Sequence, residues 1–274
     1  MIIPDNVRKC VAFLGLQMAD GSFRLAGSVF WLGQDRADGQ KAGPVYAVTA
    51  RHVIDGIRGT GVESVWFRIN QAGGNAVWLK SELKDWFVHP SDPTLDVAIL
   101  KAGLSSGWDH LVLPYSLCMT DERMAKDKVG LGDEVFITGL FRHHRGARRN
   151  IPIVRVGNVA CMTEEKVETN SFGLMDAFLV EARSIGGLSG SPVFLNLGIT
   201  RMIDGQLKHA KGAPIFYLLG LVHGHYDVEA AEVDDGGVDN IDILSVQQVN
   251  TGIAIVVPFQ SIRAVIDAYE STSS

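Results

Sequence analysis

Three side chains in this 274-residue chain have the types and settings that nucleophilic catalysis requires. Ser189 lies in the run GGLSGSPVF at 186–194, a tight glycine turn directly before an apolar strand. Small neighbours in such a turn expose a serine hydroxyl, and the backbone N–H groups of the turn can point at one substrate oxygen. The run alone is equally typical of an ordinary loop ahead of a strand, so its meaning depends on the residues upstream.

Upstream, a histidine and an aspartate are placed to activate this serine. His52 follows a β-branched and aromatic run, VYAVTARHVI at 45–54, which predicts a strand ending in a short turn. Asp96 heads the strand-like run LDVAIL at 95–100, where a carboxylate must be paired or solvated. We expect Asp96 to hold His52 in the tautomer whose other nitrogen accepts the Ser189 proton.

Three short motifs resemble those of trypsin-like, chymotrypsin-fold serine proteases. TARH at 49–52 resembles their Thr-Ala-x-His motif, DVAIL at 96–100 their Asp-Ile-Ala-Leu-Leu motif, and GLSGSP at 187–192 their Gly-Asp-Ser-Gly-Gly-Pro motif. The order His, Asp, Ser is also theirs, and differs from the subtilisin and α/β-hydrolase orders. The variant GGLSGSPVF most resembles the bacterial glutamyl-endopeptidase branch.

The resemblance implies an all-β fold of two six-stranded antiparallel β-barrels with a C-terminal α-helix. An N-terminal barrel over 1–115 would carry His52 and Asp96, and a linker over 116–130 would lead to a C-terminal barrel over 131–274 that carries Ser189. Short apolar runs between Gly, Asp, Asn and Pro clusters independently favour barrels or sandwiches. They predict strands near 9–16, 26–32, 44–50, 64–69, 84–89, 96–101, 133–139, 151–161, 175–181, 191–196, 215–222 and 252–257.

The last segment of the chain changes its hydrophobic period. Four apolar residues recur at helical spacing after Pro258, which suits the start of a helix: Ile262, Val265, Ile266 and Tyr269. The resemblance implies that this helix packs on the second barrel.

The resemblance also implies a reaction and the roles of its residues. Peptide bonds would be hydrolysed through a covalent acyl-enzyme on Ser189, with His52 as general base and then general acid, and Asp96 as its orienting partner. Backbone N–H groups of Ser189 and Gly187 would form the oxyanion hole. The expected substrate is a polypeptide, and no cofactor or metal is expected.

Substrate contacts are assigned by the same resemblance. Arg183 and Ser184 fall near the floor and wall of the pocket for the residue before the cut, where Arg183 could favour acidic side chains, face solvent or pair with the acidic loop at 227–242. Val222 replaces the histidine that glutamyl endopeptidases use. The strand at 219–224 resembles the edge that pairs with a peptide, which would bring His223, Gly224 and His225 near the substrate.

The pair His223 and His225 has a second interpretation as part of a metal site. Alternate residues of a strand share a face, so both imidazoles could bind zinc together with Asp227. The metallo-hydrolase pattern needs a further adjacent histidine, and Val228 stands in its place. The sequence therefore favours substrate contact over metal binding here.

Composition limits the partners and the compartment. The net charge of −6 argues against nucleic acid as a partner, and the basic cluster at 142–149 is predicted to be a solvated loop. No apolar run approaches the roughly 18–20 residues of a membrane span. Three widely spaced cysteines and an N-terminus without a signal-like pattern favour reduced thiols in a cytoplasm. The acidic loop at 227–242 is predicted to be a solvated surface insertion.

Leu188 bears on regulation and on the alternative functions. It stands where digestive relatives carry the aspartate that pairs with a newly cut amino terminus, so activation by that route is not expected. A cytoplasmic protease would need restraint by a regulatory protein partner, an allosteric signal or a narrow specificity, and the sequence favours none of these. The alternatives to a protease are a silent module that binds peptides or partner proteins and a metal-dependent hydrolase.

Overall fold

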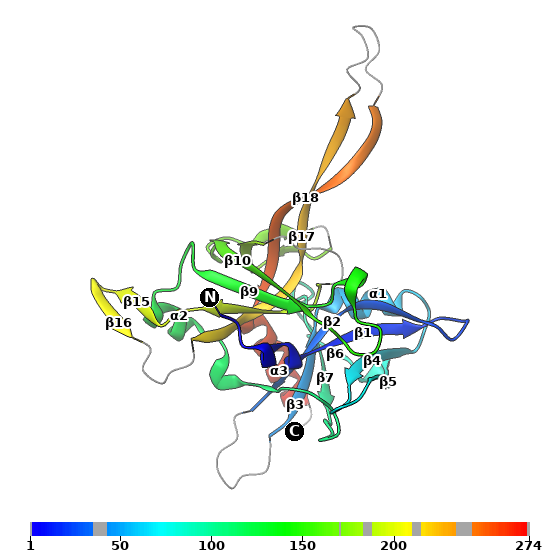
Figure 1. Cartoon of the computed structure of the whole chain (residues 1–274). Coiled ribbons are helices and arrows are strands. Elements are labelled where there is room, and N and C mark those ends of the chain that lie inside the picture. Colours follow the sequence, from blue (N-terminus) through cyan, green and yellow to red (C-terminus); the bar gives the residue numbers. More distant parts are fainter. Residues whose placement is uncertain are drawn as a thin grey trace.

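The first half of the chain forms one predominantly antiparallel sheet with a short helix (Figure 1). The computed structural model describes residues 2–34, 43–169, 171–182, 188–209, 215–233 and 243–272, with the backbone alone at 227–233 and 243–250. The elements of the first half are η1 (Asp5–Cys10), β1 (Val11–Gln17), β2 (Phe23–Gly33), β3 (Val45–Thr49), α1 (Arg51–Arg58), β4 (Ser64–Asn70), β5 (Ala76–Glu82), η2 (Leu83–Asp85), β6 (Phe87–Val88), β7 (Ala98–Ala102) and β8 (Leu113–Pro114).

This N-terminal sheet has eight strands in the order β5-β4-β1-β2-β3-β7-β6, with β8 pairing with β2. Fully buried aromatic side chains from three neighbouring strands, Phe13, Phe30 and Tyr46, fill its core. The expectation here was a six-stranded closed barrel, and the described residues contain no pairing that closes the sheet. The sequence prediction also missed β5, which pairs with β4 along its whole length.

The second half contains the remaining elements. They are η3 (Tyr115–Leu117), α2 (Asp121–Asp127), β9 (Glu134–Gly139), η4 (Arg142–His144), β10 (Ile153–Cys161), β11 (Val167–Thr169), β12 (Gly173–Met175), β13 (Phe178–Glu181), β14 (Pro192–Asn196), β15 (Thr200–Ile203), β16 (Gln206–His209), β17 (Phe216–Val233), β18 (Ile243–Pro258) and α3 (Phe259–Thr272). The stretch expected to link the two halves is thus partly helical, because the Thr120 hydroxyl caps α2 by accepting from the Arg123 N–H.

Six of these strands close into a barrel in the order β10-β13-β18-β17-β14-β9. Apolar side chains that alternate along these strands fill the interior, among them Val135, Ile137, Val193 and Val256, all fully buried. The predictions of an all-β fold, of a closed six-stranded second barrel and of a C-terminal helix are confirmed.

The two longest strands, β17 and β18, continue beyond the barrel as a two-stranded arm (Figure 1). Their pairing runs from Gly220 with Pro258 at the barrel to Val233 with Ile243 at the far end. The acidic segment at 227–242 was expected to be a surface loop. Its first seven residues belong instead to β17, and 234–242 lie outside the described residues.

The C-terminal helix α3 contacts both halves of the molecule. Its apolar face, with Ile262 and Val265 fully buried, belongs to the hydrophobic cluster that fills the N-terminal sheet. The Tyr46 hydroxyl donates to Glu270 over 3.0 Å, and the Tyr269 ring lies edge-on to Tyr46. The helix therefore packs on the barrel strands β17 and β18, as the resemblance implied, and also holds the N-terminal sheet against the barrel.

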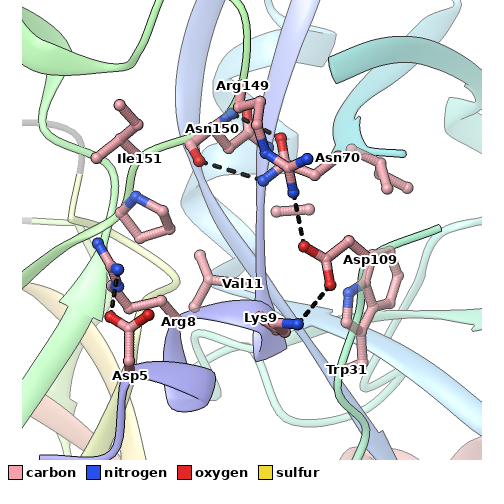
Figure 2. Close-up of a pocket in the computed structure, with 13 residues that line it drawn as sticks. Asp5, Arg8, Lys9, Val11, Trp31, Asn70, Asp109, Arg149, Asn150 and Ile151 are labelled. Atoms are coloured by element: carbon pink, nitrogen blue, oxygen red, sulfur yellow. Dashed lines mark hydrogen bonds and ion pairs between the residues drawn. The ribbon is translucent and has the colours of Figure 1, made fainter. Parts of the chain in front are cut away.

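The basic cluster at 142–149 is mostly exposed, as predicted for a solvated loop, and hydrogen bonds also tie it to the N-terminal sheet. Buried Arg68 of β4 donates to the Ala147 carbonyl over 3.0 Å and to the Asn150 side chain over 2.9 Å. Figure 2 shows the neighbouring contact, in which Arg149 and Lys9 bind the two oxygens of Asp109 at 2.6 and 2.8 Å. Arginine pairing with main-chain carbonyls and a carboxylate thus joins the β9–β10 loop to the sheet.

Two further observations concern membranes and cysteines. Within the described parts of the chain, every helix is too short or too polar to cross a bilayer. Cys10, Cys118 and Cys161 form no disulfide in the described structure, and burial raises the pKa of the Cys10 thiol far above its usual range.

Candidate active site

The general-base candidate, His52, lies in the first turn of α1. Strand β3 ends at Thr49, whose hydroxyl donates to the Ser28 carbonyl over 2.7 Å and so fastens this corner to β2. Ala50 is extended and fully buried, and the helix begins at Arg51. His52 therefore lies just beyond the end of β3, where the N-terminal sheet faces the barrel.

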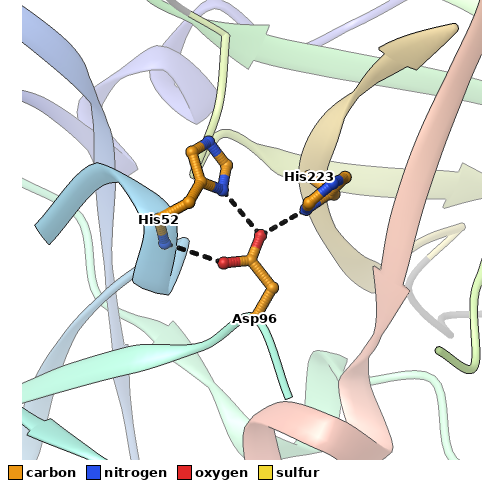
Figure 3. A group of neighbouring side chains, drawn as sticks. All are labelled: His52, Asp96 and His223. Carbon is orange, nitrogen blue, oxygen red and sulfur yellow. Dashed lines mark hydrogen bonds and ion pairs between the residues drawn. The ribbon is translucent and has the colours of Figure 1, made fainter. Parts of the chain in front are cut away.

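Asp96 is fully buried directly before β7 and holds His52 by two hydrogen bonds (Figure 3). Its Oδ1 accepts from the His52 backbone N–H over 2.9 Å, and its Oδ2 lies 2.8 Å from His52 Nδ1. An ionised carboxylate can only accept, so Nδ1 carries the proton and Nε2 is left as an acceptor. That tautomer is the one a general base needs.

A second imidazole, that of His223, shares the same carboxylate. His223 Nδ1 lies 2.6 Å from Asp96 Oδ2, and the two imidazole rings meet edge to face with centroids 5.1 Å apart. The sequence placed His223 near a bound peptide, and the structure places its ring against Asp96 (Figure 3).

A β-bulge explains why His223 points toward Asp96. In the pairing of β17 with β18, Val222 lies opposite Val256 and Gly224 opposite Ile255, so His223 is the extra residue. A second register shift follows between His225 and Asp227. Alternation of faces fails across a bulge, which removes the basis for placing His223 and His225 on one face. No sequence pattern marks this bulge.

The three hydrogen bonds set the charge of the buried carboxylate. Burial of Asp96 opposes its ionisation, but hydrogen bonds from His223 and then His52, with the positive charge of both rings, outweigh burial and lower the pKa of Asp96. Asp96 is therefore a fixed negative charge between two imidazoles at neutral pH.

Ser189 lies in a tight turn that main-chain hydrogen bonds tie to both halves. The Ser28 N–H donates to the Ser189 carbonyl, the Gly190 N–H to the Val222 carbonyl, and the Ser191 N–H to the Leu188 carbonyl, over 2.8–2.9 Å. Gly190 has φ +79°, and a Cβ there would collide with the Ser28 carbonyl and the Thr49 hydroxyl. The turn therefore requires glycine next to the serine.

The Ser189 hydroxyl donates to the His223 backbone carbonyl over 3.1 Å. Although both residues are described, no hydrogen bond joins Ser189 to His52. The structure thus brings all three predicted residues to the seam between the sheet and the barrel. The candidate base His52 is hydrogen-bonded to Asp96, whereas the hydroxyl of the candidate nucleophile, Ser189, is bonded to the His223 carbonyl.

The other predicted site residues have different outcomes. Gly187, Arg183 and Ser184 lie outside the described residues. Gly224 borders open space, since a Cβ there would meet nothing within 4 Å, and the part-buried His225 lies opposite Ala254 of β18.

The predicted peptide-pairing edge is shorter than the 219–224 segment. Strand β17 is paired on both sides up to Leu221, with β14 on one side and β18 on the other. Beyond Leu221 the described strands pair with β17 on the β18 side alone. Val222 is itself bonded to the Ser189 turn, since its N–H donates to the Ser191 carbonyl over 2.9 Å and its carbonyl accepts from the Gly190 N–H over 2.8 Å. The free edge therefore begins at His223, next to this turn.

One group of side chains in the described structure could hold a metal ion. The ligand atoms of His52, Asp96 and His223 all lie within 4.8 Å of one another. This group replaces the His223 and His225 pair that the sequence suggested.

Comparisons with known proteins give a likeness in structure alone. No protein-family model matches the chain. No curated protein matches it either.

Solved structures do resemble the chain. A crystal structure of Deg5 shares 15% identity at a TM-score of 0.47, covering 94% of this chain and 87% of the other. The protease domain of MamO from Magnetospirillum magneticum shares 16% at 0.49, covering 95% and 97%. The HtrA-type protease AlgW with a decapeptide shares 17% at 0.49, covering 96% and 65%. Similarity at this level carries no functional argument, so function must come from the side chains.

Proposed function

We propose that the chain is a serine endopeptidase with Ser189 as nucleophile, His52 as general base and Asp96 as its orienting partner. The observation that carries the proposal is the His52–Asp96 pair, hydrogen-bonded through Nδ1 at 2.8 Å, beside the glycine turn that presents Ser189. A buried carboxylate that fixes the Nε2-acceptor tautomer is the arrangement that acyl transfer needs.

The reaction begins when the Ser189 hydroxyl leaves the His223 carbonyl and turns to His52. Nε2 takes the hydroxyl proton while Oγ bonds to the substrate carbonyl carbon, and Asp96 stabilises the imidazolium that forms. The C–N bond then breaks as His52 returns the proton to the leaving amine. Water attacks the acyl-enzyme by the same proton route and releases Ser189.

The substrate is a polypeptide bound as an added strand along β17 from His223 onward. This edge lies next to Ser189, and the open space at Gly224 leaves room for a chain. Main-chain pairing of this kind supplies affinity, and pockets for alternate side chains supply specificity.

Restraint of the enzyme is part of the proposal. The Ser189 hydroxyl donates to the His223 carbonyl and must rotate away from it before it can reach His52. We attribute the release of this hydrogen bond to the binding of substrate or of a regulatory protein partner. A binding-only function is the second candidate, and the same hydrogen bond is the observation that favours it.

Covalent labelling with a fluorophosphonate probe separates the two candidates. The intact chain should be labelled and Ser189→Ala should not. Ser191→Ala is the matched control, because Ser191 lies in the same turn with a buried hydroxyl that has no hydrogen-bond partner in the described structure. Labelling that survives Ser189→Ala contradicts the proposed nucleophile. Peptides captured uncut with equal affinity by the intact and Ser189→Ala chains, without labelling, favour the binding module.

A further inference from the structure

We propose that His52, Asp96 and His223 form a zinc site that switches the enzyme off. The ligand set is two imidazole nitrogens and one carboxylate oxygen, which suits zinc and is typical of sites with three protein ligands and one open position. Zinc binding depends on these side chains alone, whereas the inhibition also rests on the proposed protease function.

The geometry requires only a small expansion to accept the ion. Both Nδ1 atoms lie 2.6–2.8 Å from Asp96 Oδ2, and all three ligand atoms are within 4.8 Å of one another. Tetrahedral zinc with bonds of about 2.0 Å separates its ligands by about 3.3 Å. The His52 side chain is 30% exposed and can move outward, while Asp96 is fully buried and stays in place.

Exposure and charge also allow an ion to enter. The His52 side chain is more exposed than that of His223, at 30% against 11%. The open coordination position therefore faces solvent on the His52 side, where water can be the fourth ligand. The Arg51 guanidinium lies 5.7 Å from the centre of the Phe172 ring, which meets the His223 ring edge to face, and it pairs with Asp55 over 3.0 Å. That carboxylate offsets the charge of Arg51, and Asp96 offsets part of the charge of the ion.

Zinc at this position would abolish general-base catalysis through the tautomer of His52. Nδ1 must give up its proton to bind the ion, so the neutral ring carries its proton on Nε2. Nε2 then becomes a donor and cannot accept the Ser189 proton, although every catalytic residue is still present. The proton moves from one ring nitrogen to the other through solvent, and none is lost overall.

His223 distinguishes this chain-specific site from an ordinary base and aspartate pair. One histidine and one aspartate alone hold zinc weakly, and the third ligand comes from the bulge of β17. Substitution of His223 should therefore weaken zinc binding far more than substitution of His225, two residues along the same strand.

Binding is tested on the full Ser189→Ala chain, free of any purification tag, by competition with a chromophoric zinc chelator. We expect one zinc per chain and an affinity loss of at least about 10-fold with His223→Gln and with Asp96→Asn, and no change with His225→Gln. Cobalt(II) in place of zinc should give the visible absorption of a tetrahedral ion, lost with His223→Gln. Thermal unfolding of each variant confirms that it is folded.

Inhibition is tested on the chain with Ser189 intact, with each rate normalised to the same variant without metal. Zinc should stop peptide cleavage and chelator should restore it, and His223→Gln should need at least about 10-fold more zinc. Absence of stoichiometric binding, or binding that survives both His223→Gln and Asp96→Asn, overturns the site. If the chain binds zinc through His223 but cleaves no peptide, the zinc site stands and the proposed protease function is wrong. If the chain cleaves peptides at a rate that zinc does not change, the protease function stands and the inhibitory zinc site is wrong.

Discussion

The two halves of the molecule hold their proposed catalytic side chains in different ways. The N-terminal sheet fixes His52 by two hydrogen bonds to one buried carboxylate, so that the proposed base is already in the tautomer it needs. The Ser189 turn of the barrel half has its backbone fixed by hydrogen bonds to Ser28 and Val222, but the Ser189 hydroxyl lies on the His223 carbonyl. The acid–base half is thus preorganised, and the nucleophile half requires one further step.

Substitution of Asp96 by asparagine should have the largest effect on activity, because it removes the carboxylate that fixes the tautomer of His52. An amide can present its N–H to Nδ1 and so select the wrong tautomer of His52. We expect kcat to fall by about 10⁴-fold with little change in KM. Steady-state cleavage of a peptide substrate measures this, and a fall of less than about 10-fold would contradict the role of Asp96.

Gly190→Ala tests the backbone rigidity of the nucleophile half. A left-handed φ and overpacking against Ser28 and Thr49 should each cost about 1–3 kcal/mol of the free energy of unfolding. Gly21→Ala is the matched control, since Gly21 has φ +80° with nothing within 4 Å of an added Cβ. Urea unfolding should show a clearly larger loss at Gly190, and equal losses would mean that the turn is not tightly packed.

Arg68→Met tests the contact that joins the two halves outside the site. Methionine keeps much of the apolar stem but leaves the Ala147 carbonyl and the Asn150 side chain without their donor. Leaving the buried Asn150 acceptor unpaired should lower the free energy of unfolding by about 1–3 kcal/mol. Faster proteolysis within 142–150 should accompany the loss. Unchanged stability and protection would show that the loop does not depend on Arg68.

The smallest effect is expected in the pH dependence of stability. The folded pKa of Asp96 lies below its unfolded value of about 3.9, so its stabilisation is fully present above about pH 4 and is lost as pH falls through the folded pKa. Asp96→Asn should flatten this acid-side decline in the free energy of unfolding. An identical decline in both proteins would assign it to other carboxylates.

The sequence predicted the local backbone of His52, Asp96 and Ser189 better than the surface around these proposed catalytic residues. The residues around His52, Asp96 and Ser189 indicate the local backbone, so these three positions could be assigned to strand ends and a turn from the sequence. His223 could not, because a bulge shifts the register without any compositional signal. The same holds for the docked loop at 142–150, since pairing of Arg68 with distant carbonyls has no local pattern.

The strand predictions failed where length or closure depends on distant partners. Strand β5 was missed because its side chains are only half buried and show little alternation. The eight-stranded sheet depends on pairing between segments far apart in the sequence. The arm is instead a hairpin of the consecutive strands β17 and β18, and its acidic composition was interpreted as a loop. Helix α2 did have a signal, the Thr120 cap with acidic residues in the first turn.

The position of α3 has a consequence for the order of folding. Its Tyr269 and Glu270 contact Tyr46 on the opposite half of the molecule, and Tyr46 precedes Glu270 by 224 positions. Contacts between segments so far apart carry a large loop-closure entropy, so they form late. We therefore expect each half to build its own sheet before α3 joins the two.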